Sequence, residues 1–357
     1  MKIGIFGNHS FPHQGGSERV IHQIASWMQN KFSHHCYVYS YTANNSVIDG
    51  VSYIDLNKEN IIKESTKLDF MFIYSDYFKQ WPTLLNSNIK CKMGIALVGM
   101  NYMLSKHEVM KVFKEKINNI KVLTHDNSYR DYQYCKDNFI PVTVINNGVD
   151  LNEFKNINSF KDKYKISKDI ILCVSNFFPG KGQEHLIKTL SAIKNELNEY
   201  KLVFISSSIN IPVGEFLRAS FIKNMNDLKL DCLFLKDIPR EDTITAYNEA
   251  SLFVFPSIKE VAPLVIMEAM ASETPWISLP VGNIPTLKGG LMCPIRGTDR
   301  NGAIWGPETY DYFGKYMLKI LKDKELSDTL KRDGKEMILS KYNWDIISNE
   351  YNDYFCN

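Results

Sequence analysis

Two glutamates, Glu260 and Glu268, have the residue type and spacing that could bind a polyhydroxylated ligand. Glu260 lies in a loop after the apolar run that ends at Phe255. Glu268 follows after seven intervening residues, among the small and apolar residues of a predicted buried helix. A buried carboxylate needs a partner or a ligand, because an unpaired charge is costly to remove from water. Either glutamate alone is explained as well by a solvated or capping residue. Together at one helix entrance, they could accept hydrogen bonds from vicinal hydroxyls of a sugar.

Lys181 is a candidate for binding an anion. It lies in the segment 175–183, directly after one predicted strand and at the start of a predicted helix. The positive end of the helix dipole disfavours a cation there unless an anion lies between them. A lysine, a helix N-terminus and aligned N–H groups would together stabilise a phosphate at this place. The alternative is a solvated loop lysine.

The third candidate stretch, residues 8–20, follows the first predicted strand. Gly15 and Gly16 would let the backbone approach a ligand, and the helix N-terminus after them favours an anion. A phosphate group or the acceptor substrate of a group-transfer reaction could bind there. A simple turn with Ser17 as the helix cap explains the same residues equally well.

Metal and disulfide chemistry have little support in the sequence. No Asp-x-Asp pair is suitably placed, and the spacing of the two glutamates does not resemble a zinc site. The 7 cysteines are scattered, odd in number and without a C-x-x-C pair, which is typical of reduced thiols.

Short apolar runs alternate with amphipathic segments of helix length, which predicts two series of βαβ units. The first series comprises the segments 2–7, 17–31, 36–41, 70–75, 93–98, 106–119, 121–124 and 142–145. The second comprises 170–175, 183–197, 201–206, 215–228, 233–235, 240–249, 252–255, 265–272 and 276–279. We therefore expect an α/β fold of two doubly wound parallel sheets. Ligands of such sheets bind beyond the carboxyl ends of the strands, so two facing sheets would form one deep cleft.

The length of 357 residues also favours two domains, and residues 151–168, polar and rich in Asn and Lys, are the predicted linker. A formal net charge of +2 gives no field that would favour nucleic acid. The chain starts with a strand-like run, and no apolar stretch has the length of a membrane span. We expect a cytoplasmic protein, peripheral on the inner face of the cell membrane at most.

Five segments in order along the chain carry a family resemblance: 15–20, 147–150, 181–182, 255–268 and 282–290. They resemble the glycine loop, interdomain turn, phosphate lysine, E-x7-E signature, and following strand and turn of the retaining glycosyltransferases of group 1, or family 4. The resemblance covers nearly the whole chain. It implies the GT-B architecture of two Rossmann-like domains. Residues 1–152, joined by a returning helix at about 340–357, would be the acceptor domain. Residues 153–339 would be the nucleotide-sugar donor domain.

The resemblance also implies a role for each matched residue. The catalytic candidates are Lys181, which would neutralise the donor diphosphate, and Glu260, which would contact the donor sugar. Both also count as donor-binding residues, and Glu268 would hold the ribose hydroxyls. The other donor-binding candidates are Gly15, Gly16, Asn176, Ile238, Ala262, Leu264 and Val265. The acceptor-side candidates are His9, His13 and Gln14.

Three positions depart from the family pattern. Asn176 stands where the family usually has an arginine, which removes a bidentate phosphate clamp. Pro263 cannot donate an N–H group within the E-x7-E loop. Residues 98–100 lack the family's frequent histidine, and His9, His13 or His107 are the candidates to replace it.

Residues 106–121 predict a basic amphipathic helix that could lie on an anionic membrane surface. Five lysines accompany apolar residues at helical spacing. A solvated outer helix of the first domain is the alternative.

The resulting hypothesis is a retaining glycosyltransferase of bacterial surface polysaccharide or lipopolysaccharide biosynthesis. It would move a hexosyl or N-acetylhexosaminyl group from a nucleotide-sugar to a glycan or lipid-linked acceptor, without a required cofactor. A UDP-sugar is the preferred donor, and GDP-mannose is the alternative. Two other hypotheses remain open: a catalytically impaired regulatory or scaffolding subunit, and a different enzyme of the same architecture such as a sugar-nucleotide 2-epimerase or a phosphorylase.

Overall fold

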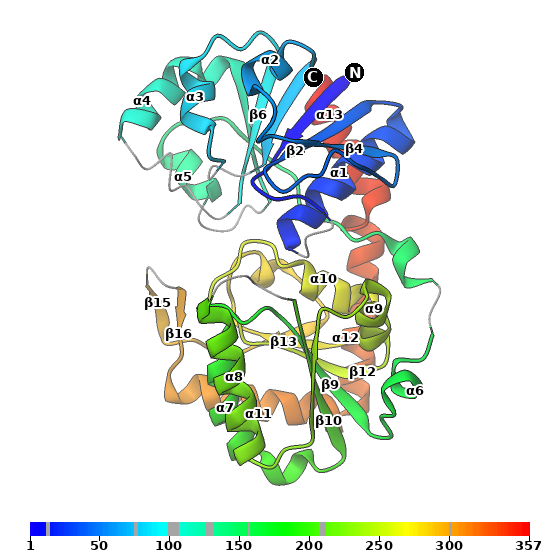
Figure 1. The fold of residues 1–357 in the computed structure, drawn as a ribbon. Coiled ribbons are helices and arrows are strands. Elements are labelled where there is room, and N and C mark those ends of the chain that lie inside the picture. Colours follow the sequence, from blue (N-terminus) through cyan, green and yellow to red (C-terminus); the bar gives the residue numbers. More distant parts are fainter. Residues whose placement is uncertain are drawn as a thin grey trace. The chain divides into compact units, whose positions relative to one another are not determined.

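The computed structural model describes residues 1–11, 15–74, 78–98, 107–125, 131–155, 158–207, 212–299 and 302–357. The chain forms two compact units, each with its own sheet and helices (Figure 1). One unit joins residues 1–147 to 344–357, and the other comprises residues 148–343. The two largely parallel sheets confirm the predicted α/β class.

The first unit contains an eight-stranded sheet of order β3-β4-β2-β1-β5-β6-β7-β8, parallel except at the β3–β4 pair. Its strands are β1 (Lys2–Phe6), β2 (His35–Ser40), β3 (Val47–Ile48), β4 (Val51–Asp55), β5 (Phe70–Tyr74), β6 (Lys92–Leu97), β7 (Ile120–Thr124) and β8 (Val142–Val144). Its helices are α1 (Gly16–Phe32), α2 (Ile61–Ser65), α3 (Trp81–Asn86), α4 (His107–Lys116), η1 (Ile117–Asn119), α5 (Asp131–Asp137) and α13 (Trp344–Cys356). All residues of β5 are buried, as expected for a parallel strand covered on both faces.

The C-terminal helix α13 belongs to this first unit. The ring of Phe355 contacts the rings of Phe70 and Phe72 on β5, with centroids 5.1 and 5.5 Å apart. The Nζ of Lys31, in the last turn of α1, donates to the carbonyl of Asp345 at 2.7 Å. Residues from the two ends of the chain thus share one core.

The second unit contains a six-stranded parallel sheet of order β11-β10-β9-β12-β13-β14 and a separate hairpin. Its strands are β9 (Asp169–Val174), β10 (Tyr200–Ser206), β11 (Cys232–Lys236), β12 (Ala250–Phe255), β13 (Trp276–Ser278), β14 (Gly290–Met292), β15 (Gly297–Asp299) and β16 (Gly302–Ile304). Its helices are η2 (Leu151–Phe154), α6 (Phe160–Tyr164), α7 (Gln183–Ala192), η3 (Lys194–Leu197), α8 (Pro212–Asp227), α9 (Arg240–Asn248), α10 (Leu264–Ala271), η4 (Ile284–Thr286), α11 (Pro307–Lys322) and α12 (Lys324–Lys341).

The predicted linker at 151–168 is wrong for most of its length. Its described residues include η2 and α6, and both belong to the second unit. Ser159 caps α6 by accepting from the N–H of Asp162 at 3.1 Å. Phe160, only 1% exposed, lies in the core of this unit. The linker was predicted from the polar composition of the segment, which gave no indication that Phe160 is buried.

The predicted amphipathic helix at 106–121 is described from residue 107, as α4 followed by the 3-10 helix η1, and two of its described apolar side chains pack inside the first unit. The α-helix ends at Lys116, and Ile120 already belongs to β7. Phe113 is fully buried against Trp81, and Ile117 packs on the same core. Phe113 and Ile117 therefore contribute to the core of the first unit, and membrane contact of this segment stays a prediction. No helix in the described part of the chain is long and apolar enough to cross a membrane.

Candidate functional site

The loops after β9 and β12 lie against each other at the point where the strand order of the second sheet reverses. From β9 the chain continues to β10 and β11 on one side, while β12 pairs with β9 on the other. The N–H of Ile258, in the loop after β12, donates to the carbonyl of Gly180, in the loop after β9, at 2.9 Å. Ligands of doubly wound sheets bind at such a switch point.

Lys181 and Glu260 form an ion pair between these two loops. The Nζ of Lys181 lies 2.7 Å from Oε1 of Glu260, and the hydroxyl of Ser257 donates to the same oxygen at 2.5 Å. The side chain of Lys181 is 30% exposed, whereas that of Glu260 is 11% exposed. The ammonium group can therefore be reached by a soluble anion, and the carboxylate is held in one orientation by two donors.

Three glycines hold the loop 256–261, which carries Glu260. Each has a positive φ, and each lies so close to a carbonyl of the loop that a Cβ atom would be 2.1 to 2.3 Å from the oxygen. Gly182 faces Pro256, Gly282 faces Val261, and Gly302 faces Ile258. Only glycine combines this backbone conformation with this approach. The loop is thus fixed by three segments that are distant in sequence.

Glu268, predicted to need a partner, is 3% exposed on α10 and is paired with Arg240 at the start of α9. The Nη2 of Arg240 donates to Oε1 of Glu268 at 2.6 Å and to Oε2 of Glu153 at 3.0 Å. Burial lowers the pKa of Arg240, but the two carboxylates outweigh it and raise this pKa above its usual value. Burial, and then the charge of Glu268, also raise the pKa of the neighbouring Tyr247. The group around Glu268 thus consists of a fixed cation, two carboxylates and a neutral phenol.

The side-chain oxygen of Asn176 contacts the protein backbone. Its Oδ1 accepts from the N–H of Ser207 at 2.8 Å, and its carbonyl accepts from Nε2 of Gln183 at 3.0 Å. Asn176 therefore joins the ends of β9 and β10 to the start of α7. An amide in this position cannot supply the charge or the bidentate geometry of an arginine.

The predicted backbone donors lie at the start of α10. Pro263 precedes the helix, and Leu264 and Val265 are its first two residues, so their N–H groups have no carbonyl to bond within the helix. Ala262 is buried just before them. Ile238 lies in the loop after β11, two residues before Arg240, and is packed on the core of the unit.

In the first unit, Gly15 precedes α1 and Gly16 is its first residue. The carboxylate of Glu18 lies against Gly15, where an added Cβ atom would overlap it. The positive end of this helix thus already has an acidic neighbour. His9 is exposed after β1. His13 and Gln14 lie outside the described residues, as do residues 99 and 100 of the segment that lacks the family's histidine.

The sequence analysis did not single out His125, at the end of β7. This ring is fully buried, with Nδ1 2.9 Å from the carbonyl of Ile145 and Nε2 2.8 Å from the hydroxyl of Tyr74. Burial lowers the pKa of His125 to about 4. A neutral ring that donates from Nδ1 and accepts at Nε2 satisfies both contacts. A lone histidine in the sequence gave no signal of this network.

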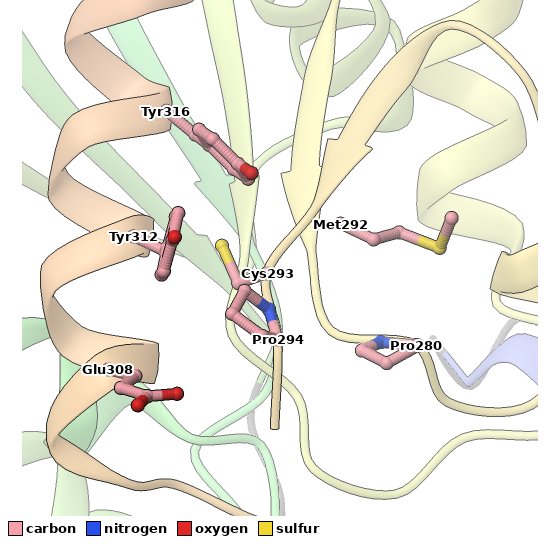
Figure 2. Close-up of a pocket in the computed structure, with 7 residues that line it drawn as sticks. All are labelled: Pro280, Met292, Cys293, Pro294, Glu308, Tyr312 and Tyr316. Atoms are coloured by element: carbon pink, nitrogen blue, oxygen red, sulfur yellow. The ribbon is translucent and has the colours of Figure 1, made fainter. Parts of the chain in front are cut away.

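A surface pocket of about 490 Å³ lies at the ends of β13 and β14 and along α11 (Figure 2). Its described lining is Pro280, Met292, Cys293, Pro294, Glu308, Tyr312 and Tyr316. None of the predicted site residues lies among them. Among the described residues, no group of three or more His, Cys, Asp or Glu side chains is arranged to hold a metal ion.

Solved structures match the fold over the full chain. The sucrose-phosphate synthase of Thermosynechococcus elongatus has a TM-score of 0.76 at 17% identity, covering 99% of this chain and 98% of that one. Anabaena HepE in complex with UDP-glucose has a TM-score of 0.76 at 14% identity, covering 99% of both chains. These likenesses and the two parallel sheets define the GT-B class of fold.

The sequence comparisons identify the family within that class. The profile of "Glycosyl transferases group 1" matches residues 154–337, more than half of the chain, and the chain belongs to this family. Among curated proteins, the capsular polysaccharide biosynthesis glycosyltransferase CapM of Staphylococcus aureus is 26% identical over 239 residues. This match spans 62% of the chain but only 57% of that relative.

Proposed function

We propose that this protein is a retaining glycosyltransferase that uses a nucleotide-sugar donor. It transfers a hexosyl or N-acetylhexosaminyl group to a glycan or lipid-linked acceptor of a bacterial surface polysaccharide or lipopolysaccharide. The observation that carries the proposal is the Lys181–Glu260 pair at the switch point of the second sheet. An accessible cation beside an oriented carboxylate suits a ligand that combines a diphosphate with a sugar.

In this proposal the donor diphosphate takes the place of Glu260 as the partner of Lys181. The carboxylate of Glu260, still held by Ser257, then accepts hydrogen bonds from the donor sugar. Glu268 accepts from the ribose hydroxyls, and Arg240 keeps this carboxylate ionised and oriented. The predicted donor site thus has one carboxylate for each sugar ring of the donor.

The reaction itself follows from the charge that develops on the leaving group. The bond between the anomeric carbon and the diphosphate oxygen breaks, and the acceptor oxygen forms a new bond to this carbon from the same face. The acceptor proton passes to the leaving phosphate, so no protein nucleophile is needed. Lys181 and the first N–H groups of α10 stabilise the charge on the leaving phosphate, which lowers the barrier.

The choice of donor and acceptor is supported by the relatives. The structural neighbour HepE was solved with UDP-glucose, which supports a UDP-sugar as one candidate donor. The relative CapM is named for capsular polysaccharide biosynthesis, which favours a surface glycan as the acceptor.

The test is a thermal-shift screen with UDP, GDP, ADP and their common sugar conjugates, with and without magnesium, followed by turnover assays of the sugar that binds. A ligand of the folded state raises the apparent stability, so a shift with one nucleotide identifies the donor base. Transfer from that donor with retained anomeric configuration is the expected result. No shift with any nucleotide at millimolar concentration would overturn the proposal.

The second candidate is a regulatory or scaffolding subunit that has lost turnover. It is favoured by Asn176, whose oxygen is bonded to the backbone of Ser207 where the family usually has a phosphate-binding arginine. The same screen separates the two functions, because a scaffolding subunit without a donor site would show no nucleotide binding.

A further inference from the structure

A short hairpin outside the six-stranded sheet contacts the loop that carries Glu260. The hairpin consists of β15 and β16 and lies between β14 and α11 in the chain (Figure 1). Its strands pair through Gly297–Ile304, Thr298–Ala303 and Asp299–Gly302. The N–H of Arg296 donates to the carbonyl of Ile304 at 3.0 Å and closes its base.

Two neighbouring residues of β16 make the contact. The N–H of Ala303 donates to the carbonyl of Ile258 at 2.7 Å. Gly302, with φ of +127°, lies so close to the same carbonyl that a Cβ atom would be 2.1 Å from the oxygen. Another residue at 302 would therefore push the hairpin and the loop apart. The two atoms nearest to its Cβ would be the backbone oxygen and carbon of Ile258, which cannot rotate away as a side chain could.

Ile258 is bonded from both sides. Its carbonyl accepts from the hairpin, and its N–H donates to the carbonyl of Gly180, one residue before Lys181. The hydroxyl oxygen of Ser257, the preceding residue, lies 3.1 Å from the same carbonyl, and its proton is directed to Glu260. Glu260 lies two residues further along and accepts from both Lys181 and Ser257. A displacement at Ile258 thus reaches the carboxylate through a few backbone bonds.

We propose that Gly302 and Ala303 are positioning residues that hold Ile258 and thereby place Glu260 against the donor sugar. The proposal rests on the proposed function, because Glu260 is assigned to the donor sugar there. It makes the hairpin a determinant of sugar transfer and leaves binding of the nucleoside monophosphate moiety to Glu268 and the start of α10. The diphosphate partner Lys181 follows Gly180, which Ile258 contacts, so binding of the second phosphate depends on the same loop. A variant that disturbs this contact should therefore lose sugar-dependent steps and retain binding of the nucleoside monophosphate.

The test compares Gly302→Ala with the matched control Gly297→Ala in the same hairpin. A Cβ atom at Gly297 meets nothing within 4 Å, although its φ is also positive. We expect Gly302→Ala to lower kcat about tenfold to a hundredfold, since small displacements of a substrate-positioning group have effects of this size. Its affinity for the free nucleoside monophosphate, which lacks the phosphate assigned to Lys181, should stay within about twofold of the wild type. Gly297→Ala should keep both values.

A second variant, Ala303→Pro, removes the N–H group that bonds Ile258 and leaves Gly302 in place. It should show the same loss of kcat with retained nucleoside monophosphate affinity. If Gly302→Ala fails to fold, this variant carries the test. Wild-type kcat in Ala303→Pro, or an equal loss in Gly297→Ala, would overturn the proposal.

Amide hydrogen exchange gives a readout that does not depend on activity. The N–H groups of Ile258 and Ala303 should exchange faster in Gly302→Ala and as in the wild type in Gly297→Ala. If the wild-type protein binds no nucleotide, the proposed function fails, while the exchange data still report whether the hairpin holds the loop. Unchanged exchange in Gly302→Ala would refute the positioning role by itself.

Discussion

At the scale of single residues, the ion pair of Lys181 and Glu260 should matter more for activity than for stability. The pair is partly exposed, so it contributes little to the free energy of unfolding, on the order of 1 kcal/mol. In the proposed function, its cation neutralises the leaving phosphate. Catalytic and structural effects of its removal should therefore differ strongly.

We expect Lys181→Ala to lower kcat about a hundredfold, the usual cost of removing one donor to a developing anion. The thermal midpoint should change by a few degrees at most. The matched control is Lys163→Ala, which removes a cation paired at 2.7 Å with Asp242 in the same unit. Steady-state kinetics and thermal unfolding of both variants check this. Equal kcat in the two variants would contradict the role of Lys181.

The second prediction concerns the two carboxylates that share Arg240. Glu268→Ala should weaken nucleoside diphosphate binding about tenfold to a hundredfold, because hydrogen bonds to a charged group are worth about 1.5 to 3 kcal/mol. Glu153→Ala removes the other partner of Arg240 and should leave this affinity within about threefold. Calorimetric titration of both variants compares them. A similar loss in both would assign the effect to Arg240 instead of a ribose contact.

The residue types of this site were predictable, but most of their partners were not. Lys181, Glu260 and Glu268 stand out because each follows a predicted strand or sits in an apolar helix. Arg240 contacts Glu268 across 28 positions, and Gly302 reaches the loop of Glu260 from a hairpin without periodicity. Such contacts depend on how distant segments pack, and the patterns in a single sequence do not reveal that packing.

At the scale of elements, the alternation of apolar runs and helices predicted the parallel strands well, because those strands are buried on both faces. It did not predict the edge strand β3, its neighbour β4 or the hairpin, whose strands of two to five residues carry no clear pattern. It also wrongly predicted a linker at residues 151–168, where the five-residue helix α6 buries the ring of Phe160 although most of its neighbours in sequence are polar. Short elements are stabilised by tertiary contacts, and their local sequence is correspondingly uninformative.

The contribution of α6 can be measured. Phe160→Ala should destabilise the second unit by about 3 to 5 kcal/mol, the usual cost of deleting a buried aromatic ring. Phe216→Ala, on α8 of the same unit, removes a ring that is 72% exposed and should change stability by less than about 0.5 kcal/mol. Urea unfolding monitored by exchange of β9 amides distinguishes them. A small effect of Phe160→Ala would support the original interpretation of the segment as a linker.

At the scale of the whole molecule, each unit has its own buried core, so the chain need not unfold in one step. The proposed donor residues Lys181, Glu260 and Glu268 all lie in the second unit, whereas His125 lies in the first. A nucleotide should therefore stabilise the second unit through mass action. Acid should act on the first unit through its buried histidine.

The sign of the acid effect follows from the pKa of His125, which is about 4 in the folded protein and about 6.5 in an unfolded chain. Between these values the unfolded state binds the proton and the folded state does not, so the stability of the first unit falls as the pH is lowered. The full loss, reached below pH 4, is about 3 kcal/mol. Well above pH 6.5 the histidine is neutral in both states and contributes no pH dependence.

The variant His125→Gln should remove this dependence, because glutamine does not titrate. Between pH 7 and pH 4 the stability advantage of the wild type over His125→Gln should shrink by about 3 kcal/mol in the first unit. Replacing the exposed His35 by glutamine is the control for the loss of an imidazole from the first unit. Denaturant unfolding of each protein across this pH range, followed by exchange of β5 and β7 amides, measures the difference. Parallel curves for wild type and His125→Gln would mean that the buried ring accepts a proton without breaking its bonds to Tyr74 and Ile145.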